Sequence, residues 1–121
     1  MSAEWIWKNG EFIRWEDANV HVTTHALHYG SSVFEGIRAY ATPDGPGIFR
    51  LNPHSERLLQ GCKVARIDLA YTAETINEVI VETVRRNGHE SCYIRPLVFR
   101  GAGLLGLEGR KNPTEMVIFT L

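Results

Sequence analysis

The run of residues 32–40, SVFEGIRAY, restricts the fold more than any other part of the sequence. Its alternating side chains predict a β-strand. One face of that strand combines aromatic rings, a gap and a charge, carried by Phe34, Gly36, Arg38 and Tyr40. A glycine inside a strand marks a bulge or a place where another group must approach the backbone. The face therefore suits a ligand with an apolar body and an anionic end, although a half-buried strand with Arg38 extending into water explains the same residues.

A strand of similar character is predicted for residues 91–99, SCYIRPLVF. Its alternation brings a phenol, a guanidinium and two apolar side chains onto one face, namely Tyr93, Arg95, Leu97 and Phe99. Pro96 has no backbone N–H to donate, so this strand is expected to lie at a sheet edge or to be broken at Pro96.

Turn signals predict two hairpins around these strands. Asn9 and Gly10 stand between two runs rich in aromatic residues, which is a strong hairpin signal. Residues 42–47 are dense in turn formers and predict a second hairpin, with its return strand over residues 48–51. A last strand is predicted over residues 115–121.

Two amphipathic helices are predicted between the second hairpin and residue 91. The first is expected to be capped by Asn52, to have Pro53 in its first turn and to pack on the sheet through Leu58, Leu59, Cys62 and Ala65. The second is expected to be capped by Thr72 and to end at Asn87 and Gly88. This order predicts an α+β fold, an antiparallel sheet with both helices on one face, and it leaves the other face for a partner.

Composition excludes several classes of protein. A chain of 121 residues is expected to form one domain, and its 13 basic and 14 acidic residues provide no general attraction to nucleic acid. No apolar run is long enough to span a bilayer and the first residues lack the regions of a signal peptide, so a cytoplasmic location with no membrane partner is expected. Cys62 and Cys92 lack disulfide or zinc spacing and are expected in the core.

Two motifs that could bind a ligand are better explained without one. His21, His25 and His28 have helical metal-ligand spacing, but the β-branched residues between them disfavour a helix, so structural histidines and no metal are predicted. Residues 101–106 match GxGxxG, but the residues up to Pro113 break the helix that a dinucleotide site needs. A flexible loop with apolar side chains at its tip is predicted instead.

Several motifs together resemble one family. The run HALHYGSSVFEGIRAY, the opening WxNGEFxxWEDAxVHV, the ERL of the first helix and the YIRPLVF strand resemble the branched-chain amino acid aminotransferases, which are fold-type IV pyridoxal phosphate enzymes. The resemblance covers the whole chain and implies that residues 1–121 are the small N-terminal domain of that fold. In the family a larger domain with the cofactor-holding lysine follows, and it is absent from this sequence. The isolated domain is therefore expected to be inactive.

The resemblance also implies a reaction and roles for individual residues. The reaction is transfer of the amino group of leucine, isoleucine or valine to 2-oxoglutarate, with pyridoxal phosphate as cofactor and glutamate as product. Arg57, which by its position alone is an ordinary solvated helix charge, matches the residue that binds the cofactor phosphate. Substrate-binding residues are implied at Phe34, Gly36, Arg38, Tyr93 and Arg95, with Tyr29 supplied by a partner subunit of a homo-oligomer.

Other functions remain open at this stage. Two sister enzymes of the same group, D-amino acid aminotransferase and aminodeoxychorismate lyase, are disfavoured by VFEGIRAY together with YIRPLVF. A non-catalytic domain that self-associates through the exposed sheet face and the last strand is an alternative of another class.

Overall fold

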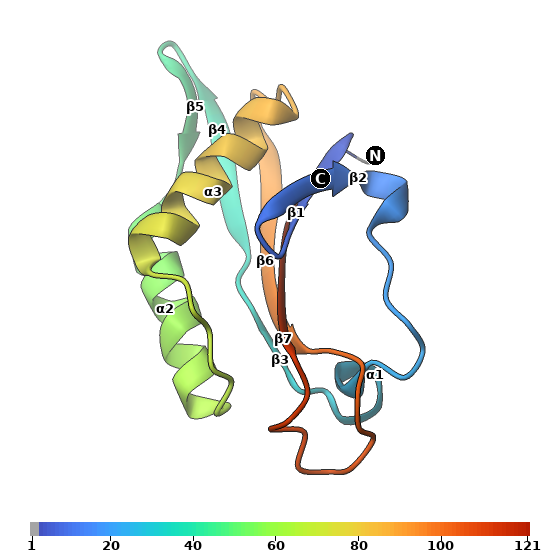
Figure 1. Cartoon of the computed structure of the whole chain (residues 1–121). Helices are drawn as coiled ribbons and strands as arrows, with labels where there is room; N and C mark the ends of the chain where they lie inside the picture. The colour runs from blue at the N-terminus through green and yellow to red at the C-terminus, as the bar shows by residue number, and fades with distance from the viewer. Residues whose placement is uncertain (1–2) are drawn as a thin grey trace.

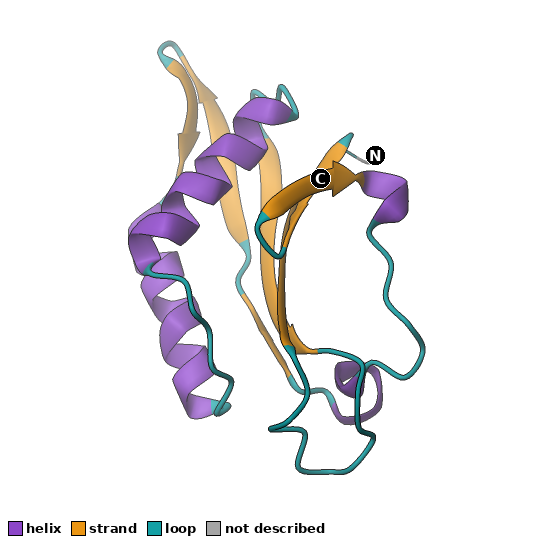
Figure 2. Ribbon diagram, in the orientation of Figure 1, coloured by secondary structure: helices purple, strands orange, loops and turns teal. Residues whose placement is uncertain are grey.

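A computed structural model describes residues 3–121, which form an antiparallel sheet with two long helices on one face (Figures 1 and 2). The elements within these residues are β1 (Trp5–Lys8), β2 (Glu11–Arg14), the 3-10 helix η1 (Trp15–Asp17), α1 (His25–Tyr29), β3 (Ser32–Phe34), β4 (Ile37–Thr42), β5 (Gly45–Ile48), α2 (Leu51–Val64), α3 (Ala73–Arg86), β6 (Cys92–Arg100) and β7 (Thr114–Thr120). The predicted α+β class and both helices are confirmed. Among residues 3–121, no helix has the length and apolar character needed to cross a membrane.

The sheet has β6 near its centre. Its strands follow the order β2-β1-β7-β6-β4-β5, with β3 also paired to β6, and every pairing is antiparallel. Helices α2 and α3 cover one face, where the side chains from the sheet are almost completely buried. These core residues include Ile37, Ile94, Val98, Met116 and Ile118. Burial of such side chains is the main driving force for the fold.

The predicted strand over residues 32–40 is in fact two strands, β3 and β4, separated at Glu35 and Gly36. Both pair with β6 in one continuous register, so no residue has been inserted. The interruption lies opposite Pro96, whose carbonyl accepts the Glu35 N–H at 3.1 Å but which has no N–H to donate in return. The expectation of an edge strand or a break within β6 is therefore wrong, because the break falls in the neighbouring strand.

The two predicted hairpins agree with the structure to different degrees. The first hairpin is confirmed, with Asn9 and Gly10 both at positive φ between β1 and β2. In the second hairpin the return strand β5 ends at Ile48, so the predicted strand over residues 48–51 is wrong. Phe49 still pairs through its N–H with the Arg38 carbonyl, and helix α2 then begins at Leu51.

The predicted helix caps give one correction and one confirmation. Arg50, in the left-handed region at φ 53°, precedes α2 in place of the predicted Asn52, so Asn52 already lies in the first turn and donates to the Glu56 carboxylate instead. Thr72 caps α3 as predicted and accepts the Thr75 N–H. The predicted end of α3 at residues 87–88 is also confirmed, and the last strand is present as β7 but begins and ends one residue earlier than predicted.

The two cysteines are core residues, as predicted. Cys62 on α2 and Cys92 on β6 are 2% and 6% exposed. Burial raises the pKa of both thiols, so both remain in the uncharged form at neutral pH.

Helix α2 approaches β3 closely at Gly61. A Cβ atom at this position would lie 2.7 Å from Cγ1 of Val33. Gly61→Ala is expected to lower the free energy of unfolding by roughly 1 kcal/mol, because overpacking outweighs the gain in helix propensity. Urea unfolding followed by circular dichroism would measure this change. The double variant Gly61→Ala/Val33→Ala is the control, and it should be no less stable than Val33→Ala alone. Additive losses would contradict the packing argument.

Candidate functional site

The strand register brings the predicted substrate residues onto the sheet face away from α2 and α3. Residues directly opposite on antiparallel strands share a face. Arg38 stands opposite Tyr93, and Phe34 stands opposite Leu97. The same register sets Gly36 opposite Arg95. The predicted grouping on β6 is confirmed as well, because Tyr93, Arg95 and Leu97 alternate with fully buried neighbours.

Arg95 is at the centre of this cluster. Its Nη2 donates a hydrogen bond to the Tyr93 hydroxyl at 2.6 Å, and its guanidinium carbon lies 4.0 Å from the centroid of the Phe34 ring. The guanidinium carbon of Arg38, on the neighbouring strand, lies 5.8 Å from the centroid of the Tyr93 ring. The Nε atom of Arg95 is buried and has no hydrogen-bond partner within residues 3–121. The cluster thus combines an exposed aromatic ring with a guanidinium that retains unused donors.

Gly36 makes room for this arrangement. A Cβ atom there would lie 2.5 Å from the Tyr93 hydroxyl oxygen. Any side chain at position 36 would displace the phenol and break its contact with Arg95. The phenol of Tyr93, on the neighbouring strand, therefore occupies the space that the missing side chain of Gly36 leaves.

Arg57 lies on helix α2, on the other side of the sheet, and pairs with Glu35. Its Nε and Nη2 donate to the two Glu35 carboxylate oxygens, each at 2.8 Å. His54, one turn earlier on the same face of α2, contacts the carboxylate through Nδ1 at 2.7 Å. Glu35 is only 7% exposed, whereas the Arg57 side chain is 71% exposed.

The environment of Glu35 stabilises its charged form. Burial by itself would raise the pKa of this carboxyl, but hydrogen bonds from Arg57 and His54 and their positive charges together outweigh it. The pKa of Glu35 is therefore lowered from its ordinary value. The pKa of Arg57 is raised by the same hydrogen bond and charge, so this residue is permanently cationic.

Tyr29 lies apart from the other predicted site residues. It is the last residue of α1, and its hydroxyl donates to the Leu105 carbonyl at 2.6 Å. Figure 1 shows α1 next to the loop between β6 and β7, at the end of the sheet farthest from β5. The ring is 43% exposed. A single copy of the chain therefore does not bring Tyr29 to the Arg95 cluster.

Two polar side chains hold this loop: Asn112, which the sequence did not single out, and His25, which it predicted to be structural. Asn112 Nδ2 donates to the carbonyls of Gly101 and Leu104 at 3.0 and 2.9 Å. His25, buried as expected of a structural histidine, contacts Ser31 Oγ and the Gly106 carbonyl. The predicted apolar tip is present, with exposed side chains at Leu104, Leu105 and Leu107. No group of three or more His, Cys, Asp or Glu suited to a metal occurs in the described part of the chain.

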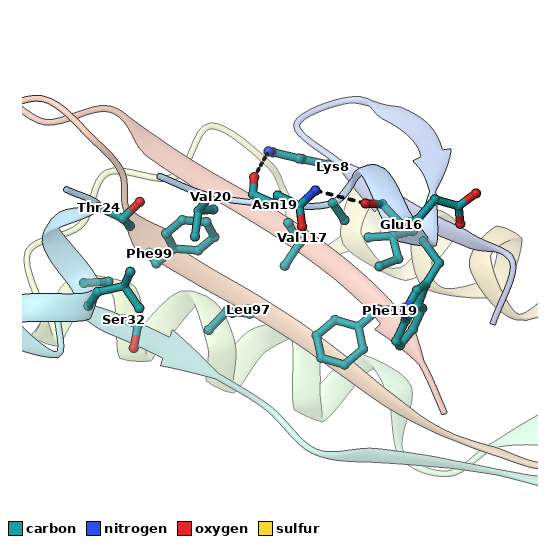
Figure 3. Close-up of a pocket in the computed structure, with 15 residues that line it drawn as sticks. Lys8, Glu16, Asn19, Val20, Thr24, Ser32, Leu97, Phe99, Val117 and Phe119 are labelled. Atoms are coloured by element: carbon teal, nitrogen blue, oxygen red, sulfur yellow. Dashed lines mark hydrogen bonds between the residues drawn. The ribbon is translucent and has the colours of Figure 1, made fainter. Parts of the chain in front are cut away.

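An apolar cavity of about 580 Å³ lies on the same sheet face as the Arg95 cluster (Figure 3). Its floor is formed by Leu97, Phe99, Val117 and Phe119, and the segment from Trp15 to Leu27 passes along its side. Lys8 Nζ holds this segment through the Asn19 carbonyl at 3.1 Å. The sequence predicted an uncovered face here but not a cavity.

Comparison with known proteins assigns the chain to a family. The family described as amino-transferase class IV matches residues 32–121, which is most of the chain and includes every candidate residue except Tyr29. The chain belongs to the class IV aminotransferases. The branched-chain-amino-acid aminotransferase of Pseudomonas aeruginosa is 45% identical over 113 residues, which cover 93% of this chain and 37% of that enzyme. For the enzyme of Escherichia coli K12 the identity is 48% over 99 residues, covering 82% of this chain and 32% of that enzyme.

Solved structures of class IV relatives confirm the predicted fold. The branched-chain amino acid aminotransferase of T.th., complexed with N-(5'-phosphopyridoxyl)-L-glutamate, superposes with a TM-score of 0.96 and 49% identity. The match covers 99% of this chain and 41% of that one. The same enzyme complexed with 4-methylvaleric acid gives a TM-score of 0.95. The chain has the fold of the small N-terminal domain and spans less than half the length of these relatives.

The Glu35 network makes a prediction about stability and pH. Glu35→Gln is expected to lower the free energy of unfolding at pH 7 by roughly 1 kcal/mol, because the buried carboxylate and its charged hydrogen bonds are lost. The loss is modest because the Arg57 partner is largely exposed to water. The pKa of Glu35 is lower in the folded than in the unfolded chain, so this contribution is complete above the unfolded value of about 4.5 and is lost as pH falls through the folded value.

Urea unfolding at a series of pH values would check this prediction. The stability difference between the wild type and Glu35→Gln should be present at about pH 5 and above and should shrink below about pH 4.5. Glu56→Gln, an exposed neighbour on α2, is the matched control and should show a much smaller effect. A difference for Glu35→Gln that persists unchanged in acid would contradict the prediction.

Proposed function

We propose that this chain is the small domain of a pyridoxal phosphate-dependent aminotransferase that moves the amino group of leucine, isoleucine or valine to 2-oxoglutarate. The observation that carries this proposal is the arrangement of Phe34, Tyr93 and Arg95. An apolar ring stands beside a guanidinium with unused donors, so one surface can accept either an apolar or an anionic side chain. The identity to branched-chain aminotransferases supports the same reaction.

Each residue of the cluster has a role in this proposal. Phe34 forms part of the wall around a branched apolar side chain. Arg95 binds the side-chain carboxylate of glutamate or 2-oxoglutarate, and Tyr93 orients the α-carboxylate. Arg38 adds positive charge beside Tyr93, and Gly36 leaves the space in which the Tyr93 hydroxyl lies.

Arg57 is proposed to bind the cofactor phosphate. Its Nε and Nη2 are used by Glu35, but Nη1 has no acceptor within residues 3–121, and the side chain is 71% exposed. A guanidinium that is always charged and keeps free donors fits a phosphate group. When bound, pyridoxal phosphate would supply an electron sink for removal of a proton from the substrate.

The lysine needed to hold the cofactor is proposed to lie in another segment. Lys63 and Lys111 are exposed, and Lys8 is bound to the Asn19 carbonyl close to Glu115. None is in the buried, apolar setting that lowers the pKa of a reactive lysine. We therefore infer that this chain works with a larger domain.

Tyr29 is proposed to act in the site of a neighbouring subunit in a cytoplasmic homo-oligomer. Its ring is partly exposed, and its hydroxyl is attached to a loop whose apolar side chains face outward. Exposed apolar groups of this kind are typical of an interface. In one copy of the chain the Tyr29 hydroxyl binds the Leu105 carbonyl and not the Arg95 cluster, which agrees with a role in another copy.

The proposed substrate role of Arg95 can be tested in a hybrid enzyme. The hybrid joins this chain to the remaining part of the T.th. aminotransferase. Arg95→Ala is expected to lower kcat/KM for glutamate by about 10- to 100-fold, since a charged hydrogen bond is lost, and to change the value for leucine only a few-fold. Arg85→Ala, on the exposed end of α3, is the control. Equal losses for glutamate and leucine would show that Arg95 does not discriminate between them.

The isolated chain is expected to have no transaminase activity. Leucine, 2-oxoglutarate and pyridoxal phosphate would be incubated with the 121-residue chain, and glutamate would be measured by mass spectrometry. The hybrid enzyme provides the positive control. Glutamate formation by the wild-type chain, lost in Lys8→Ala or Lys63→Ala, would refute the inference that the reactive lysine lies elsewhere.

A further inference from the structure

The cluster of Glu35, His54 and Arg57 has more hydrogen bonds than a simple exposed ion pair. Three donors meet one carboxylate: Arg57 Nε binds Oε2, whereas Arg57 Nη2 and His54 Nδ1 both bind Oε1. The carboxylate is 7% exposed and His54 is 21% exposed, so both are shielded from water. Neither Glu35 nor His54 has a role in the function proposed above.

The geometry restricts the direction of the Arg57 guanidinium. A bidentate contact through Nε and Nη2 fixes the plane of the group and directs Nη1 away from Glu35. A long side chain that is 71% exposed would otherwise occupy many rotamers, and fixing it costs conformational entropy. In the ligand-free chain the contact with Glu35 already fixes the side chain, so this entropy is lost before a ligand binds.

Glu35 is itself held in place from two directions. Its backbone lies at the interruption between β3 and β4, where its N–H binds the Pro96 carbonyl at 3.1 Å. Its side chain is held by His54 from the same helix that carries Arg57. The position of the Glu35 carboxylate between the sheet and α2 is therefore fixed.

We propose that Glu35 and His54 are positioning residues that hold the Arg57 guanidinium in the one orientation in which its free donors meet a phosphate group. This inference rests on the proposed role of Arg57 in phosphate binding. Glu35 fixes the guanidinium directly, and His54 fixes the carboxylate. Arg57 then binds phosphate without losing further side-chain freedom.

Positioning and simple electrostatics make opposite predictions for Glu35→Gln. The substitution removes a negative charge next to Arg57, so charge alone predicts tighter phosphate binding. Loss of positioning predicts weaker binding, by about 3- to 10-fold for one side chain that must be ordered again. Glu56→Gln removes the same charge from the adjacent position on α2, where Glu56 contacts Asn52 and not Arg57. This control reports the effect of charge without a change in positioning.

The first measurement is made on the ligand-free 121-residue chain by NMR of the arginine Nε–Hε groups. Arg57, identified by Arg57→Lys, is expected to give a slowly exchanging and ordered signal. The ordered Arg57 signal should be lost in Glu35→Gln and kept in Glu56→Gln. It should be weakened in His54→Ala and restored in His54→Asn, because the asparagine amide can replace Nδ1 as a donor. An unchanged Arg57 signal in Glu35→Gln would overturn the positioning role.

The second measurement follows the Arg57 signal during titration with inorganic phosphate and with pyridoxal phosphate. Weaker binding in Glu35→Gln, together with equal or tighter binding in Glu56→Gln, is the expected result. Tighter binding in both variants would overturn the positioning role and leave Arg57 as the phosphate contact. No response of the wild-type Arg57 signal to either compound would contradict the proposed function of Arg57, while the ligand-free spectra would still decide whether Glu35 and His54 position it.

Discussion

The missing N–H of Pro96 is the constraint on which the rest of the site depends. At this point in the sheet Glu35 donates to Pro96 but receives nothing back, so the strand pairing is interrupted for Glu35 and Gly36 without a change of register. The interruption lies in the strand beside β6, at a point where, within residues 3–121, that strand has no pairing on its other side, because β5 pairs only with residues 39–42. Two neighbouring residues are thereby released from ordinary strand pairing, and each supports a different group of charged side chains.

The alternation of a strand assigns these two residues to opposite sides. The Glu35 side chain faces α2 and meets Arg57, whereas Gly36 opens onto the far face and accommodates the Tyr93 hydroxyl that binds Arg95. One short segment thus supports two guanidinium groups separated by the thickness of the sheet.

The sequence predicted those parts of the fold that local rules govern. Alternation placed Phe34 with Arg38 on the face of one strand and Tyr93 with Arg95 on the face of another, and the Asn9 turn and the Thr72 cap follow from their own side chains. Consequences that depend on a neighbouring strand could not be derived this way. The sequence shows that Pro96 cannot donate, but its partner lies 61 positions earlier, so local rules predict an edge strand or a break at Pro96 and not the break in the paired strand. The Glu35 carboxylate was overlooked for the same reason, because its partners on α2 are separated from it by a whole hairpin.

The interruption is in contact with both charged groups. A movement of the backbone at Glu35 and Gly36 would shift the carboxylate that holds Arg57 and, at the same time, open or close the space in which Tyr93 lies. Regular strand pairing would resist the movement with one hydrogen bond more than Pro96 allows. The same missing donor that breaks the strand therefore leaves one short segment in contact with both the Arg57 guanidinium and the phenol that binds Arg95.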